Sequence, residues 1–260
     1  MQWEGGIKMK KTLLKYNKPL LTTMVQADNP HRIKELMDKS VPEGAEAFGI
    51  QFEQMKSEYR KKEVYKDLFK YAKDKPVYVT NYRIALNEGK SDDVLSEELI
   101  ELAECGADLC DVMGDYFDRQ PDEVAVSKTA IEKQKELINK IHNKGSKVLM
   151  SSHVLKYTPA ERVLEIALEH QSRGADICKI VTGADNMEQQ LENLKIINML
   201  KEKLDIPFLF LCGGECHILR RIGGEIGCCM YLCVHEYDKL ATPHQPLLKN
   251  VKIIRDTIRL

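Results

Sequence analysis

The chain alternates between two kinds of segment, and this alternation limits the folds open to it. Short apolar runs are separated by stretches with apolar residues at spacings of three and four, which are typical of amphipathic helices. Strands that alternate with helices form parallel sheets, whose strands are apolar because helices cover them. We predict eight strands, over residues 19–25, 47–53, 76–83, 109–114, 147–153, 177–183, 207–214 and 227–234.

Eight such units in a chain of 260 residues predict a single α/β domain, an eight-stranded parallel (β/α)8 TIM barrel over residues 19–260. An open doubly wound sheet has the same local pattern. However, no GxGxxG follows the first strand, which disfavours a dinucleotide-binding version of that fold. We expect residues 1–18 to form a flexible N-terminal lead-in.

The composition narrows the classes of partner. A net charge of −1 argues against an electrostatic surface for nucleic acid or anionic lipid. No apolar run is long enough to cross a bilayer, and the first 18 residues lack the apolar region of a secretion signal. We therefore expect a cytoplasmic protein that acts on a small molecule, without nucleic-acid or membrane partners.

Eight cysteines are present, but no CxxC pair occurs. The segment 212–233 brings several thiols close to histidine, so a zinc site there is conceivable. Its last three cysteines, however, lie in an apolar run where cysteine serves as a small hydrophobic residue. We expect no metal.

Chemistry in a barrel of this kind takes place at the carboxyl ends of the strands. There the chain places Arg83, His153, Arg221 and, after the last strand, the segment Thr242–Gln245. Lys179 stands in the middle of the sixth predicted strand, ICKIVTG, where strand alternation points it into the barrel.

A lysine in that position suggests imine chemistry. Burial disfavours the charged amine, and a neutral amine can attack a ketone to form a Schiff base that serves as an electron sink. His153, on the neighbouring strand, could remove and return the adjacent proton. No cofactor is needed for this chemistry. Alternatively, Lys179 forms a structural ion pair with Asp111 or Glu53, and His153 is a satisfied core histidine.

Two segments, KVLMSSHVLKYTP and RGADICKIVTG, carry a family resemblance. With GAEAFGIQFE, VTNYRIALNEGK, GADLCDVMGD, RRIGGEIG and TPHQP, they resemble the type I 3-dehydroquinate dehydratases, Schiff-base enzymes of the shikimate route to aromatic amino acids. The resemblance extends from about Pro19 to Gln245. It implies conversion of 3-dehydroquinate to 3-dehydroshikimate by loss of water, in a homodimer.

The resemblance also implies roles for individual residues. The catalytic residues are Lys179 as imine former, His153 as general acid and base, and Glu88 as the carboxylate that supports the histidine. Glu88 stands one residue further from Arg83 than the family's spacing. The expected substrate-binding residues are Arg83, Arg221, Gln245, Gln51 and Thr242, with Arg221 and Gln245 on the substrate carboxylate. The loop 236–246 is expected to close over the substrate.

Several positions depart from the family pattern. Gly49 and Gln51 replace a glutamate and an arginine that contact substrate hydroxyls, and Met113 replaces a glutamate. Ala241 stands for a serine, which Thr242 beside it could replace. The remaining departures are Glu53, Val154 and His244. A different hydroxyl pattern on the substrate is one hypothesis. The alternatives are another class I Schiff-base lyase or aldolase on a related cyclic keto acid, and a barrel that binds a small carboxylate without turning it over.

Overall fold

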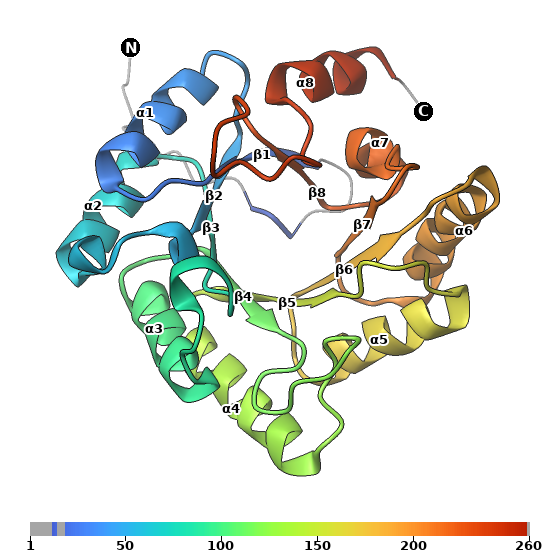
Figure 1. The fold of residues 1–260 in the computed structure, drawn as a ribbon, viewed down its shortest axis with the longest axis horizontal. Coiled ribbons are helices and arrows are strands. Elements are labelled where there is room, and N and C mark those ends of the chain that lie inside the picture. The colour runs from blue at the N-terminus through green and yellow to red at the C-terminus, as the bar shows by residue number, and fades with distance from the viewer. Residues whose placement is uncertain (1–11, 15–18, 259–260) are drawn as a thin grey trace, which may run out of the picture.

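The structure is a computed structural model that describes residues 12–14 and 19–258. Its strands are parallel neighbours in the order β7-β6-β5-β4-β3-β2-β1-β8, so that β8 returns to β1 and the sheet curls into a nearly closed barrel (Figure 1). The predicted TIM barrel is therefore confirmed. The lead-in predicted over 1–18 lies outside the described residues apart from 12–14. The strands are β1 Leu20–Val25, β2 Ala47–Gln51, β3 Val77–Thr80, β4 Leu109–Met113, β5 Lys147–His153, β6 Ile177–Gly183, β7 Phe208–Gly213 and β8 Met230–Cys233.

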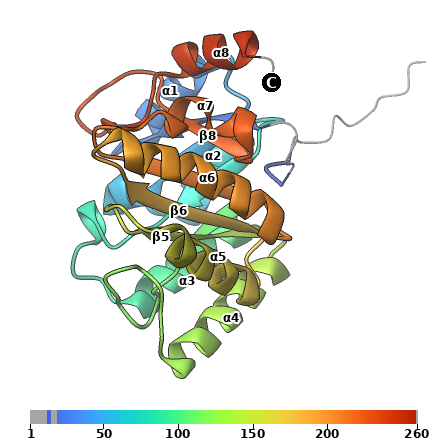
Figure 2. The ribbon, with the colours of Figure 1, turned by 90° about the vertical axis from the view of Figure 1, so that its right-hand side faces the viewer.

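Helices surround the sheet and bury its outer face (Figures 1 and 2). Asparagine or serine caps three of them: Asn29, Ser91 and Asn186 each accept a hydrogen bond from a first-turn backbone N–H. The α-helices are α1 Pro30–Ser40, α2 Lys62–Tyr71, α3 Asp92–Glu104, α4 Lys128–Asn143, α5 Ala160–Ser172, α6 Met187–Lys203, α7 Leu219–Ile226 and α8 Leu248–Thr257, and the short 3-10 turns are η1 Phe52–Gln54, η2 Ser57–Tyr59 and η3 Ala85–Asn87. No helix in the described ranges has the length and apolar character that a membrane span requires.

Strand register places the polar residues of the barrel interior. β5 and β6 pair with Ser151 opposite Lys179 and His153 opposite Val181. Because side chains alternate along a strand, these four residues share one face. Lys179 is 4% exposed, which agrees with an inward direction.

The loop after β4 folds back over the end of its own strand. A Cβ on Gly114 would lie 2.4 Å from the carbonyl oxygen of Glu123, so glycine is required where the loop returns. Arg173, the residue after α5, holds this loop in place with its side chain. Its guanidinium donates to the carbonyl oxygens of Gly114 and Ala125 at 2.9 and 2.8 Å and to Gln134 Oε1 at 2.8 Å.

We predict that Arg173→Met lowers the free energy of unfolding by about 3 kcal/mol, because the Ala125 carbonyl and Gln134 Oε1 lose their guanidinium donor and the Gly114 carbonyl loses one of its donors. Arg162→Met on the same helix is the matched control. The Arg162 side chain is 41% exposed where it pairs with Asp122 and Glu165, and ion pairs in contact with solvent contribute little, so its loss should cost less than about 0.5 kcal/mol. Urea unfolding of both variants measures the difference, and equal losses would contradict the assignment.

Glu53 is fully buried beneath the site and accepts hydrogen bonds from Thr80 Oγ1 at 3.0 and 2.8 Å. Burial raises the pKa of its carboxyl to about 7. The folded state therefore binds this proton more tightly than the unfolded state, so stability is lost as the pH rises from about 4.5 towards 7.

We predict that Glu53→Gln removes this pH dependence. Between pH 4.5 and 7, the stability of the original protein should fall by about 3 kcal/mol relative to the variant. Chemical denaturation at pH 4.5, 6 and 8 provides the comparison. A stability difference that stays constant over this range would show that Glu53 titrates as it does in the unfolded chain.

Candidate active site

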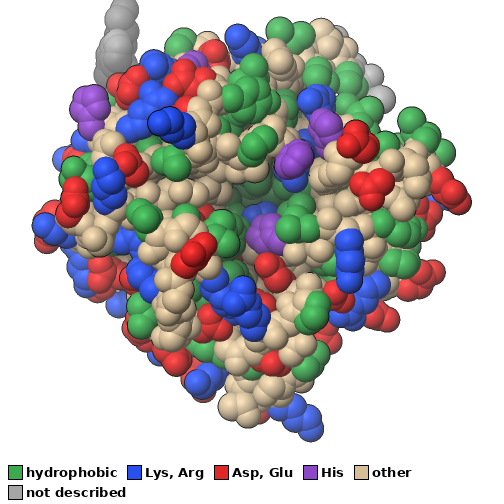
Figure 3. Space-filling view, in the orientation of Figure 1, with side chains coloured by type: hydrophobic (Ala, Val, Ile, Leu, Met, Phe, Trp, Pro, Cys, Tyr) green, Lys and Arg blue, Asp and Glu red, His purple; other side chains and the backbone are tan. Residues whose placement is uncertain are grey.

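A cavity of about 510 Å³ opens at the carboxyl ends of the strands. It appears in Figure 3 as a hollow in which a histidine and apolar side chains are visible. Seven of the predicted or weighed residues line it: Lys179, His153, Arg83, Gln51, Thr242, His244 and Gln245. Two predicted residues, Glu88 and Arg221, are not among the lining residues.

Lys179 lies among three oxygen atoms. Its Nζ donates to Tyr82 Oη at 2.7 Å, to Tyr78 Oη at 3.2 Å and to Asp111 Oδ2 at 3.2 Å. Three hydrogen bonds are the full donor capacity of an ammonium group. Of the two ion-pair partners weighed from the sequence, the structure selects Asp111.

Asp111 holds this cluster together. It accepts hydrogen bonds from Tyr78 and Tyr82, and from Ser151 Oγ at 2.5 Å. Burial, with the nearby charge of Asp111, keeps the pKa of both tyrosines well above the usual value. The phenols therefore stay protonated and donate to the carboxylate, which leaves their oxygen lone pairs to accept from Lys179.

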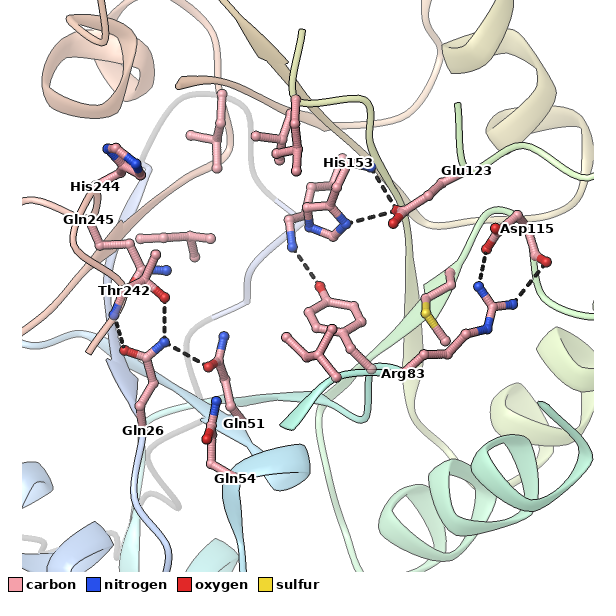
Figure 4. A pocket seen from close by; sticks show the side chains of 18 of the residues that line it. Gln26, Gln51, Gln54, Arg83, Asp115, Glu123, His153, Thr242, His244 and Gln245 are labelled. Atoms are coloured by element: carbon pink, nitrogen blue, oxygen red, sulfur yellow. Dashed lines mark hydrogen bonds and ion pairs between the residues drawn. The ribbon is translucent and has the colours of Figure 1, made fainter. Parts of the chain in front are cut away.

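The partner of His153 is Glu123 (Figure 4). Glu123 Oε2 accepts from the His153 backbone N–H at 2.7 Å and lies 2.9 Å from the ring Nδ1. Burial opposes ionisation of Glu123, but these contacts with His153 hold its pKa below the usual value. Glu123 has a backbone φ of 49°, and a left-handed conformation in a non-glycine residue is a form of strain that concentrates at functional sites.

The prediction that Glu88 supports His153 is wrong. Glu88 is exposed at the end of η3, and this turn directs Asn87 inward instead. Asn87 Nδ2 donates to Asn81 Oδ1 and to the carbonyl of Tyr82, both at 2.8 Å. A carboxylate in the loop after the fourth strand was a signal for Glu123, because parallel β4 and β5 are neighbours and end at the same edge.

The predicted cation Arg221 is replaced in the cavity by Arg220. Arg220 is 8% exposed, lines the cavity, and donates from Nε to the carbonyl of Cys212 at 2.8 Å. Burial lowers its pKa. Within residues 12–14 and 19–258 no carboxylate lies at ion-pair distance, so its remaining N–H groups are available for an anion. α7 begins at Leu219, and its start decides which of two consecutive arginines faces inward.

Arg83 lines the cavity but is engaged by protein carboxylates. Its Nε and Nη2 pair with Asp92 at 2.6 and 2.7 Å, and its Nη1 pairs with Asp115 at 2.6 Å. A fourth bond reaches the Asp115 carbonyl at 3.0 Å. Four of its five N–H donors are therefore occupied by protein oxygens in a salt bridge at the rim of the cavity, rather than left free for the predicted substrate contact.

The opposite side of the cavity carries neutral amides and a hydroxyl (Figure 4). Gln26, which sequence reasoning missed, donates from Nε2 to Gln51 Oε1 at 2.7 Å and to Thr242 Oγ1 at 2.6 Å. The Thr242 backbone N–H donates to Gln26 Oε1 at 2.8 Å. Gln245 is 5% exposed, and its Oε1 lacks a partner in the part of the chain that the structure describes.

Two departures from the family pattern have a structural consequence. A Cβ on Gly49 would lie 2.3 Å from Met24 Sδ, so the Met24 side chain fills the space of a longer residue at this position. Met113 lines the cavity in place of a carboxylate. The interior near β2 and β4 is therefore less charged than the resemblance implied.

The cysteines take no part in this site. Seven of the eight are buried, Cys216 is partly exposed, and all are free. In the described ranges, no group of three or more His, Cys, Asp or Glu side chains is arranged to hold a metal ion.

Comparison with known proteins places these features in a family. Residues 22–252 match the sequence model of the type I 3-dehydroquinases. The 3-dehydroquinate dehydratase of Alkaliphilus oremlandii (strain OhILAs) is 35% identical over 92 residues, 35% of this chain and 36% of that protein. The enzyme of the same name from Syntrophotalea carbinolica is 33% identical over 94 residues, 35% of this chain and 37% of that protein. The chain spans about a third of the length of the curated relatives it matches.

Solved structures agree in fold. The type I 3-dehydroquinate dehydratase from Clostridium difficile, with covalently modified comenic acid, superposes with a TM-score of 0.76 at 19% identity, covering 95% of this chain and 98% of that one. The 3-dehydroquinate dehydratase from Geobacillus kaustophilus HTA426 gives a TM-score of 0.77 at 15% identity, covering 93% of each chain. From the family match over 22–252, this chain belongs to the type I 3-dehydroquinase family.

Proposed function

We propose that this protein is a Schiff-base hydro-lyase of the 3-dehydroquinate dehydratase type. One observation carries the proposal: the buried amine of Lys179 and the Glu123-supported ring of His153 face the same cavity, which also contains Arg220, a cation without a carboxylate partner among the described residues. These are a nucleophile, a proton carrier and an anchor for a carboxylate. Together they suit a small keto acid such as 3-dehydroquinate.

The first step is release of the amine. Lys179 gives one proton to Asp111, which already contacts its nitrogen, and the free amine then adds to the substrate ketone. The carbon–nitrogen bond forms as the ketone oxygen leaves as water, and the product is an iminium. The proton held by Asp111 balances this step: Asp111 returns it to Tyr82, with which it is hydrogen-bonded, as the Tyr82 hydroxyl, 2.7 Å from Nζ, gives its own proton to the leaving oxygen.

The second step is elimination. The iminium acidifies the adjacent C–H, and His153 accepts that proton while Glu123 stabilises the charged ring. The same proton then leaves with the β-hydroxyl as water, so the substrate loses one water and gains a double bond. Hydrolysis of the iminium consumes one water and restores Lys179, which makes the net change the loss of a single water.

The substrate carboxylate is assigned to Arg220. A guanidinium offers paired N–H donors that match a carboxylate, and this one is buried, where such a pair is strong. Gln245 and Thr242 reach the same cavity from the loop after β8. The homodimer expected from the family resemblance belongs to the proposal, and light scattering of the purified protein tests it.

A second reading rests on the ion pair itself. The Lys179–Asp111 contact, with side chains 5% and 0% exposed, is also the arrangement of a structural pair. In that case the barrel binds a small carboxylate on Arg220 without turning it over. An aldolase-type lyase on a related keto acid uses the same lysine and is distinguished by its product.

Borohydride reduction in the presence of 3-dehydroquinate tests the imine. We predict a single covalent adduct on the peptide that contains Lys179, and an increase in the ultraviolet absorbance of an enone without reductant. Lys179→Met should abolish both signals. Lys147→Met, on the exposed start of β5, should retain them. A folded protein that forms no adduct favours the non-catalytic reading.

A matched pair of variants, Glu123→Gln and Glu88→Gln, tests which carboxylate supports His153. Glu123→Gln should lower kcat about 100-fold, because the ring loses the charge that stabilises its protonated form. Glu88→Gln should leave kcat within about twofold, because Glu88 is exposed and outside the cavity. Steady-state assays of the two variants decide, and the reverse order of effects would restore Glu88 to the role implied by the resemblance.

A further inference from the structure

Most charged groups around the cavity are paired with one another. Among the lining carboxylates, Asp115 is engaged by Arg83 and Glu123 is engaged by His153. Lys179 is paired with Asp111 below. Arg220 is buried and Arg119 is exposed, and both line the cavity without a carboxylate partner in the described part of the chain, so the buried Arg220 can anchor a carboxylate of the ligand.

A backbone hydrogen bond fixes the orientation of one amide opposite the catalytic pair. The Thr242 N–H can only donate, so Gln26 must direct its Oε1 towards it. Gln26 Nε2 then faces Gln51 and Thr242 and must find acceptors there. The orientation of the Gln26 side chain, 3% exposed, is therefore set by the protein and not by a ligand.

The orientation of Gln26 determines which group of the Gln51 amide faces the cavity. Because Gln26 presents N–H to Gln51, the carbonyl oxygen of Gln51 is used at 2.7 Å, and its Nε2 is left for the cavity. The cavity therefore meets an N–H donor at Gln51, and a ligand oxygen opposite it accepts a hydrogen bond. If Gln51 presented its carbonyl oxygen instead, an ether or carbonyl oxygen of the ligand would face no donor, which weakens binding about tenfold, whereas a hydroxyl could still donate.

We propose that Gln26 sets the specificity of this site through Gln51, so that the preferred substrate is a keto acid with an oxygen that accepts a hydrogen bond opposite Gln51. This inference rests on the proposed Schiff-base function. The hydroxyl eliminated as water faces His153, on the other side of the cavity from Gln51 (Figure 4).

The most direct test is to turn the Gln51 amide around by substituting Gln26. In Gln26→Glu, one carboxylate oxygen still accepts from Thr242 N–H, and the other replaces the donor that faced Gln51. Gln51 then turns its Nε2 to the new carboxylate and its Oε1 to the cavity, although Gln51 itself is not substituted. The probes are 4-hydroxy-3-oxocyclohexane-1-carboxylate and its 4-methoxy ether, which differ in a single hydrogen-bond donor.

The measurement is the half-saturating concentration of each probe for borohydride trapping on Lys179. We expect the hydroxy-to-methoxy preference to shift about tenfold towards the hydroxy ketone in Gln26→Glu. Gln51→Glu, a second variant that places an acceptor directly, should shift it in the same direction. Gln54→Glu is the matched control: Gln54 lines the same cavity and has no side-chain hydrogen bond among the described residues, so it adds the charge alone.

Three outcomes overturn the inference. If the hydroxy-to-methoxy preference stays within twofold in both Gln26→Glu and Gln51→Glu, Gln26 does not act on the ligand through Gln51. If Gln54→Glu shifts the preference equally, the effect comes from the added charge alone. In both cases trapping itself persists, so the proposed function stands. The absence of any adduct with either probe and with 3-dehydroquinate removes the Schiff-base function, and this inference with it.

Discussion

The buried contact between Lys179 and Asp111 is the interaction on which the rest of the site depends. An unpaired ammonium inside a barrel is too costly to persist, and an unpaired carboxylate is equally so. Each group makes the other tolerable, and Tyr78, Tyr82 and Ser151 complete the hydrogen bonds of the carboxylate. The barrel can therefore keep an amine at its centre in a defined position, and in the proposed mechanism this amine transfers a proton to Asp111 before the nitrogen attacks.

Charged and neutral side chains lie on different sides of the mouth of the barrel. The side formed by the loops after β3 and β4 contains charged groups that neutralise one another, with Arg83 between two aspartates and His153 against Glu123. The side formed by β1, β2 and the loop after β8 contains amides and a hydroxyl. Arg220 adds a buried positive charge that has no carboxylate partner among the described residues. Under the proposed function, chemistry and recognition are thus separated across the cavity, so a substitution among the amides is expected to change the substrate without altering the proton carriers.

The fold and the placement of Lys179 and His153 could be predicted from the sequence, because they depend on periodicity. Alternation along 177–183 points Lys179 inward whatever the loops do, and the adjacent strand brings His153 to the same edge. The predictions that failed concern residues whose position depends on the path of a loop or on the residue at which a helix begins. Arg220 and Arg221 differ by one helical step, and only the observed beginning of α7 selects between them. Glu123 depends on a loop that folds back across Gly114 and is held by Arg173. Gln26 gave no signal of its own, since its role arises from contacts with residues 25 and 216 positions away in the sequence.

A crystal structure of the borohydride-reduced complex with a keto acid tests the central claim most directly. The account predicts a covalent bond from Lys179 Nζ to the former ketone carbon, Asp111 and Tyr82 still in contact with that nitrogen, and the carboxylate against Arg220. A ligand held on Arg220 with an unmodified Lys179–Asp111 pair, or an adduct on another lysine, would contradict it.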